Sequence, residues 1–145
     1  HLLGQEGLAL HEVEDLLYHE SGLLGVSGIS ADSRDLLESD APEAKEAIDL
    51  FTLRITGEVA RLATTLGGLD AIVFTAGVGE NQPAVRAGVC DRLGWLGLDL
   101  DPAANAVNAM LISTAESRTA AFVIPTDEEQ VIAEETVSLL GSAGK

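Results

Sequence analysis

The segment most informative about chemistry is the run AIVFT-AGVGENQ-PAVR, from Ala71 to Arg86, which joins a β-rich stretch to a helix start through a glycine-containing turn. Glycines at such a turn let backbone N–H groups approach an anion or a nucleotide, and the helix dipole adds favourable potential. The spacing of Gly77 and Gly79 is not that of a P-loop, and GxG turns are common. The pattern therefore leaves two interpretations open: an anion-binding turn, or a tight turn that requires positive φ.

Two polar residues follow these glycines. The carboxylate of Glu80 would repel a phosphate, so beside a nucleotide it would have to face ribose, base or metal; otherwise it is an anion near the N-terminus of the next helix. Asn81 either caps that helix or hydrogen-bonds an adenine edge. On pattern alone, capping is favoured for Asn81.

A third candidate is the single cation of the segment ADSRD, Arg34, which lies between Asp32 and Asp35. A guanidinium holds phosphate oxygens or ribose with fork geometry. The alternative is a local ion pair with the neighbouring aspartates, and the residue pattern alone favours this alternative.

The segment PTDEE places Glu128 after an apolar run and at the start of a helical pattern. A hard cation such as Mg²⁺ takes oxygen ligands and often only one or two protein carboxylates. Asp127, Glu128 and Glu129 would also stabilise the helix N-terminus through its dipole, and the pattern alone favours that role. Thr126 and Glu129 have the spacing of a capping box.

Apolar periodicity and glycine or proline breaks predict the elements that position these residues. We expect helices over residues 10–20, 42–66, 83–93, 102–110 and 127–140, fully buried strands over 71–75 and 119–124, and a short strand over 96–100. Residues 23–35 and 76–82 are expected to be loops, the first with at most a short helical turn.

Side-chain placement follows from the same patterns. The long helix starts at Pro42 and carries one apolar stripe that runs to Leu66. Asn105 and Asn108 are expected on the polar side of their helix, and Trp95 and the three phenylalanines in the core.

The order of elements predicts an α/β fold with two parallel strands joined by a right-handed crossover and flanked by helices. Parallel strands are normally covered on both faces and flanked on both sides, and an isolated pair is rarely stable. Part of the parent sheet is therefore expected to be missing from this sequence.

Composition narrows the class of protein. The 46% hydrophobic content predicts a folded core, and a net charge of −16 without a Lys/Arg cluster makes nucleic acid and anionic membranes poor partners. The lone Cys90 excludes an intramolecular disulfide and fits a reducing, cytoplasmic location.

No apolar run approaches about 20 residues and no signal-peptide pattern occurs, so neither a membrane span nor a leader is expected. The opening on His1 instead of Met suggests a processed or truncated protein.

Four motifs occur in order along the chain: SGLLGVSGISADSRD, LDAIVFTAGVGEN, LGWLGLDLD and FVIPTDEEQVIAEET. Together they resemble the C-terminal part of acetate kinases, nearly from end to end. The resemblance implies a partial RNase H-like (actin-like ATPase) domain of the acetate and sugar kinase, Hsp70 and actin superfamily. It further implies that residues 1–145 are the C-terminal portion of a nucleotide-binding domain including its C-terminal helix, with ATP or ADP, Mg²⁺ and a second copy of the chain as partners.

Residue by residue, the resemblance implies a nucleotide-contacting set that consists of Asp32, Ser33, Arg34, Gly77, Val78, Gly79, Glu80 and Asn81. The first three match a D-x-R segment, and the others match a G-I-G-E-N loop around the adenosine. Glu128 matches the first Glu of a P-T-x-E-E segment, a Mg²⁺ ligand. Ser33 replaces a bulky apolar residue, so weaker packing against the nucleotide is expected, whereas Val78 in place of Ile should matter little.

The implied activity is phosphoryl transfer from MgATP to acetate, which yields acetyl phosphate and ADP. In the family the acetate site, the residues that stabilise the transfer and an H-L-G-N-G phosphate loop lie upstream of this sequence, so no catalytic residue is assigned here. Phosphoryl transfer depends on positioning, and the 145 residues alone are expected to be inactive. The alternatives are a noncatalytic nucleotide-binding or dimerisation module, and a propionate or butyrate kinase parent.

Overall fold

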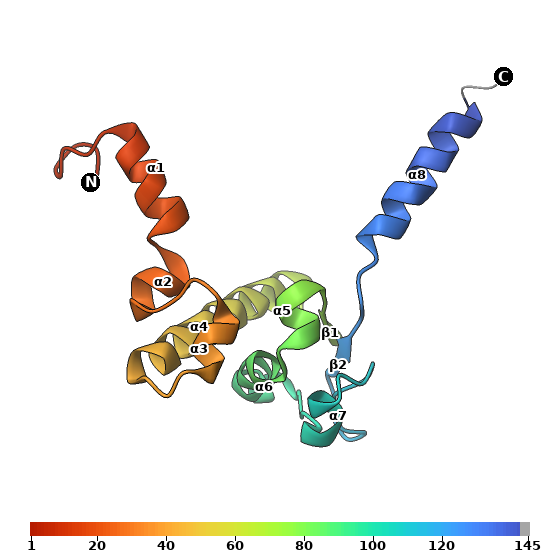
Figure 1. Ribbon diagram of the computed structural model, residues 1–145. Coiled ribbons are helices and arrows are strands. Elements are labelled where there is room, and N and C mark those ends of the chain that lie inside the picture. Colours follow the sequence, from red (N-terminus) through yellow and green to blue (C-terminus); the bar gives the residue numbers. More distant parts are fainter. Residues whose placement is uncertain (143–145) are drawn as a thin grey trace.

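The computed structural model describes residues 1–142, apart from the side chains of residues 128, 135, 138 and 140–142. Its strands are β1 (Ala71–Phe74) and β2 (Ala120–Val123). Its helices are α1 (Leu10–His19), α2 (Gly22–Ser27), α3 (Ser33–Glu38), α4 (Pro42–Leu66), α5 (Ala76–Asn81), α6 (Pro83–Arg92), the 3₁₀ helix η1 (Gly94–Leu96), α7 (Pro102–Ala106) and α8 (Glu128–Ser142). Figure 1 shows α2 and α3 beside the long α4, the two strands near α5, α6 and α7, and α1 and α8 extending away on opposite sides.

The two strands pair in parallel, from Ala71 opposite Ala120 to Phe74 opposite Val123. Helices α5 and α6 follow β1, and α8 follows β2, so the carboxyl ends of both strands lie at the same edge. The α/β prediction with two parallel strands and flanking helices is confirmed.

The main core lies between β1, β2 and α6. Its fully buried members are Phe74, Val89, Cys90, Leu93, Leu98, Ile112, Ala121 and Val123. The prediction that β1 is fully buried is wrong, because Val73 on its other face is 50% exposed. In the described part of the chain, this two-stranded sheet is covered only on the face that carries Phe74 and Val123.

Helix α4 begins and ends where the sequence predicts, with proline in its first turn and Gly67 at its C-cap in the left-handed region. Its buried face differs from the predicted stripe, because Thr52 and Thr56 are buried while Leu62 and Leu66 are exposed. The hydroxyl of Thr56 donates to the carbonyl of Thr52, which makes its burial tolerable.

A close approach of α6 explains why threonine lies on this face of α4. A Cβ added at Gly88 would lie 3.1 Å from Cγ2 of Thr52, so the two helices pack through small side chains. The exposed leucines lie farther along α4, beyond this contact.

The predicted loop over residues 23–35 is instead occupied by α2 and the start of α3. The left-handed Gly28 ends α2, and the carboxylate of Asp32 caps α3 by accepting a 2.8 Å hydrogen bond from the backbone N–H of Arg34. Residues that form turns also cap helices, so the same composition fits both structures.

Four smaller predictions are also wrong. Residues 96–100 form no strand, because Gly97 at φ 86 ends η1 and only Leu100 makes an isolated bridge. Helix α7 ends at Ala106, four residues early, and its Asn105 is buried, not on a polar face. Trp95 is 65% exposed instead of in the core.

The C-terminal helix forms as predicted but is capped differently. The carboxylate of Asp127 accepts a 2.8 Å hydrogen bond from the N–H of Gln130, whereas the Thr126 hydroxyl bonds elsewhere, so the predicted capping box is absent there. Within residues 1–142, no helix combines the length and apolarity needed to cross a membrane.

Candidate functional site

A pocket of about 430 Å³ lies between α3 and α5, near the carboxyl end of β1. Two segments more than 40 residues apart line it: Asp32, Ser33, Arg34, Gly77, Val78, Asn81 and Gln82. Six of these seven belong to the set that sequence comparison predicted. Gly79 and Glu80, the other two members of that set, lie in α5 behind this surface, and Gln82 was not predicted.

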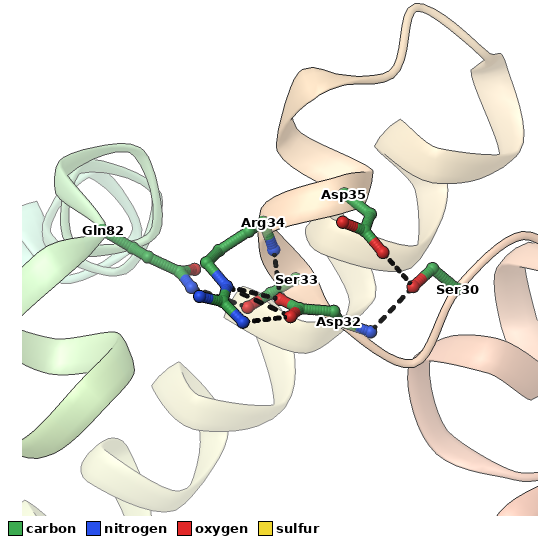
Figure 2. Close-up of polar contacts among 6 residues, drawn as sticks. All are labelled: Ser30, Asp32, Ser33, Arg34, Asp35 and Gln82. Carbon is green, nitrogen blue, oxygen red and sulfur yellow. Dashed lines mark hydrogen bonds and ion pairs between the residues drawn. The ribbon is translucent and has the colours of Figure 1, made fainter.

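The α3 wall of the pocket is organised by the ion pair of Arg34 with Asp32 (Figure 2). The guanidinium donates to the carboxylate through Nε at 3.1 Å and through Nη2 at 2.5 Å. These charge-assisted hydrogen bonds lower the pKa of Asp32 to about 2. The local ion pair favoured by the sequence is confirmed, yet the guanidinium stays exposed and open to a ligand.

The hydroxyl of Ser30 holds this wall from behind. It accepts a 3.0 Å hydrogen bond from the N–H of Asp32 and donates at 2.7 Å to the carboxylate of Asp35 (Figure 2). Asp35 therefore bonds the serine, and Asp32 alone forms an ion pair with Arg34.

The α5 wall is a helix, so the prediction of a loop over residues 76–82 is wrong. Ala76 enters the helix in the left-handed region at φ 58, while Gly77 and Gly79 do not have positive φ. The side chain of Asn81 donates a 3.0 Å hydrogen bond to the Gly77 carbonyl, so it does not cap α6 as predicted. The residue at the start of α6 is Gln82.

Glu80 ties α5 to the carboxyl ends of both strands. Its Oε1 accepts hydrogen bonds from the N–H of Ala76 at 2.7 Å, and from the N–H and hydroxyl of Thr126 at 2.9 and 3.0 Å. The bond from the Thr126 N–H contributes most to lowering the pKa of this carboxyl group. Glu80 thus caps its own helix, and not the next one, and joins β1 to the segment that follows β2.

Sequence reasoning missed Arg86, which is fully buried in α6 and fixes the other end of α5. Its Nη1 donates to the carbonyls of Gly79 and Glu80 at 2.8 and 2.9 Å. Its Nε and Nη2 reach Asn105 and Asn108 of the α7 region. Burial lowers the pKa of this guanidinium. The only signal in the sequence was an arginine in a helix turn between two valines that belong to the core.

The predicted metal ligand Glu128 is the first residue of α8, two positions after the threonine that bonds Glu80. Its side chain lies outside the described part of the structure. Among the described side chains no group of three or more His, Cys, Asp or Glu is placed to hold a metal ion.

The two glycines of α5 make a testable contrast. A Cβ at Gly79 would lie 3.1 Å from the backbone carbon of Phe74, whereas a Cβ at Gly77 meets nothing within 4 Å. We expect Gly79→Ala to lower the free energy of unfolding by about 1–3 kcal/mol, because the strand backbone cannot give way. Gly77→Ala should leave stability unchanged or raise it by up to about 1 kcal/mol. Urea unfolding measures both, and equal stabilities of the two variants would contradict the close contact.

Two parallel strands with flanking helices and a polar pocket at the carboxyl end of one strand define an α/β protein, here part of an actin-like ATPase fold. Solved structures agree with this class. An acetate kinase from Porphyromonas gingivalis matches with a TM-score of 0.84 and 38% identity, over 96% of this chain and 36% of that one. A propionate kinase from Francisella tularensis matches with a TM-score of 0.85 and 33% identity, over 92% of this chain and 35% of that one.

The chain belongs to the acetokinase family, whose model matches residues 1–134. An acetate kinase from Rhizobium meliloti is 52% identical over 142 residues, which cover 98% of this chain and 36% of that protein. One from Rhodopseudomonas palustris strain TIE-1 is 54% identical over 135 residues, which cover 92% and 34%. The chain therefore spans about a third of the length of the curated relatives it matches.

Proposed function

We propose that the chain is the C-terminal portion of the nucleotide-binding domain of an acetate kinase. The complete enzyme would transfer a phosphoryl group from MgATP to acetate and release ADP and acetyl phosphate. One observation carries this proposal: the fold brings Asp32–Arg34 together with Gly77, Val78 and Asn81, far apart in sequence, at the walls of one pocket. Its volume of about 430 Å³ is within the usual range of about 300–1,000 Å³ for small-ligand sites.

Each wall has a role in this proposal. Arg34 supplies the exposed fork for phosphate or ribose oxygens, and the aspartate that pairs with it holds the guanidinium in place. Gly77 leaves open space at its Cα, so the adenosine can approach the backbone of α5 closely. Val78 offers an apolar surface, and Asn81 offers the carbonyl oxygen of its amide. Gly79 and Glu80 hold α5 in position from behind.

Mg²⁺ would be held by Glu128 together with phosphate oxygens of the nucleotide. When bound, the ion neutralises charge on the phosphates during transfer. The support is positional, because α8 starts at this residue, two positions after the Thr126 that Glu80 binds.

The residues that bind acetate and stabilise the transfer are proposed to lie outside these 145 residues, so this chain by itself would bind nucleotide without turnover. The complete enzyme is proposed to act in the cytoplasm as a homodimer. An apolar groove between α2 and α4, lined by Leu23, Val26, Leu50 and Phe51, is a surface that a second copy would cover. A dimerisation role without catalysis is the alternative that this groove favours.

A propionate kinase is the second candidate for the parent enzyme. The structural match to the propionate kinase from Francisella tularensis supports it, at a TM-score close to that of the acetate kinase match. The pocket described above would bind nucleotide in either enzyme, so the choice of acid depends on residues beyond this chain.

The test is a titration of the 145-residue chain with MgADP, followed by amide NMR shifts. Saturable shifts should centre on residues 32–34 and 77–82. A folded chain that shows no shifts, or shifts only elsewhere, would contradict nucleotide binding at this pocket. The same sample should form no acetyl phosphate from MgATP and acetate, and acetate-dependent turnover would contradict the proposed absence of the transfer residues.

A further inference from the structure

One buried hydrogen bond crosses the floor of the pocket. Nε2 of Gln82, at the junction of α5 and α6, donates to Oγ of Ser33 at the start of α3, over a distance of 2.8 Å. Figure 2 shows the glutamine reaching across from its own helix toward the serine. Ser33 is 6% exposed and Gln82 is 8% exposed, so water scarcely competes for this bond.

This bond is the direct polar link between the two walls. Helices α3 and α6 each pack against α4, and α5 packs against α6, so α4 supports both walls of the pocket. Among the residues that the structure describes, no other hydrogen bond runs from residues 30–38 to residues 76–92. The distance between the walls is therefore set by α4 underneath and by this contact within the pocket itself.

The glutamine depends on the serine to stay buried. Its other polar atom, Oε1, is buried and has no hydrogen-bond partner in the described part of the chain. A buried carboxamide whose oxygen has no partner carries a desolvation cost. Loss of the partner of its nitrogen would leave both polar atoms unsatisfied. Without the Ser33 hydroxyl, the Gln82 side chain should leave the floor of the pocket for solvent.

We propose that Ser33 and Gln82 form a latch that fixes the separation of the two pocket walls and so positions Arg34 and α5 for a nucleoside diphosphate. The latch rests on the proposed function, because the ligand is the one assigned to this pocket. It also gives Ser33 a role other than the weaker packing expected from its sequence. The serine is a positioning residue that holds the glutamine of the opposite wall.

The first test needs no ligand. In the free chain, Ser33→Ala should shift the amide NMR signals of residues 77–82, and Gln82→Leu should shift those of residues 32–35. Ser39→Ala is the matched control, because Ser39 lies at the other end of α3 and its hydroxyl accepts a hydrogen bond from the neighbouring Ala41 N–H. It should leave residues 77–82 unchanged. If Ser33→Ala and Ser39→Ala act alike on residues 77–82, the latch does not exist.

The second test is a double-mutant cycle on the affinity for MgADP. Each single variant, Ser33→Ala or Gln82→Leu, should weaken binding by about 2- to 10-fold, the range of one neutral hydrogen bond. The double variant should bind no worse than the weaker single variant, because both remove the same contact. Effects that multiply, or no effect at all, would overturn the positioning role.

The two tests separate this inference from the function on which it rests. If the unaltered chain does not bind MgADP, the proposed binding of nucleotide by this chain fails, and the role in nucleotide positioning fails with it. The shifts across the pocket in the free chain would then still decide whether the two walls are joined by this bond.

Discussion

Replacing Arg86 with methionine is expected to lower the free energy of unfolding by about 3 kcal/mol or more. The guanidinium is fully buried and makes five hydrogen bonds to carbonyl and amide oxygens. Methionine keeps much of the volume but removes all five of these donors, and each oxygen left buried and unsatisfied costs about 1–3 kcal/mol. A single domain has about 5–15 kcal/mol of stability in total, so this one change removes a large share.

The measurement is urea unfolding of the variant beside two companions. Arg92→Met is the matched control, because Arg92 is an exposed arginine in the same helix, and its loss should change stability by less than about 0.5 kcal/mol. Arg86→Lys keeps the charge but not the fork, so it should fall between the two. An Arg86→Met variant as stable as Arg92→Met would contradict the role of this network.

The network also explains how α5 is held for function. Arg86 binds the carbonyls of Gly79 and Glu80, and the carboxylate of Glu80 binds the first N–H of the same helix. A six-residue helix has little stability of its own. The pocket wall is therefore rigid because a buried cation fixes one end of α5 and a carboxylate joined to Thr126 fixes the other.

The features predicted from sequence were those that depend on local pattern. The long α4 follows from its proline start, its apolar period and its glycine end. The strands β1 and β2 follow from short β-rich runs between breaks, and their parallel pairing follows from the helices between them.

The features that sequence reasoning missed depend on contacts between distant residues. Segment 76–81 contains two glycines and looks like a loop, yet it is helical because Glu80 and Arg86 hold it from both ends. The partners of Arg86 in α7 and just after it lie 19 and 22 residues further along the chain. Neither the hydrophobic periodicity nor the residue spacing of the sequence indicates that Arg86 pairs with these residues.

In the candidate site, too, local motifs could be predicted from the sequence, whereas contacts between distant residues could not. The motifs identified the two segments of the pocket, and the fold brings six of the eight predicted residues to its surface. The roles within it were harder to predict. Asn81 bonds back into its own helix, and the Ser33 hydroxyl meets a glutamine 49 residues away.

Replacing Arg34 with alanine is expected to weaken binding of MgADP to the 145-residue chain by about 10- to 100-fold. A hydrogen bond from a guanidinium to a charged oxygen contributes about 1.5–3 kcal/mol, and each 1.4 kcal/mol is about tenfold in affinity. Isothermal titration calorimetry measures the change. Arg61→Ala is the matched control, because Arg61 is also exposed and paired with a nearby acid, Glu58, but lies on α4 outside the pocket. Equal affinities of the two variants would contradict a ligand contact by Arg34.

The pKa of Asp32 reports its ion pair with Arg34, independently of any ligand. Arg34 holds this pKa at about 2, so in Arg34→Ala it should return toward its ordinary value of 3.8. Because the pKa is lowered in the folded chain, the ion pair is fully present above about pH 4 and is lost as the pH falls toward 2. The carboxylate is ionised at pH 7 with or without the arginine, so a change in its protonation cannot explain weaker binding there.

The alanine variant does, however, leave that ionised carboxylate uncompensated in a pocket proposed to receive a diphosphate. Part of the lost affinity should therefore be repulsion by Asp32 and part the missing fork of Arg34. Asp32→Asn in the Arg34→Ala background separates the two, because it removes the charge and keeps an oxygen to cap α3. We expect the double variant to recover some affinity at low salt, and less at high salt, where the repulsion is screened. No recovery at any salt concentration would mean that the phosphates do not lie near Asp32.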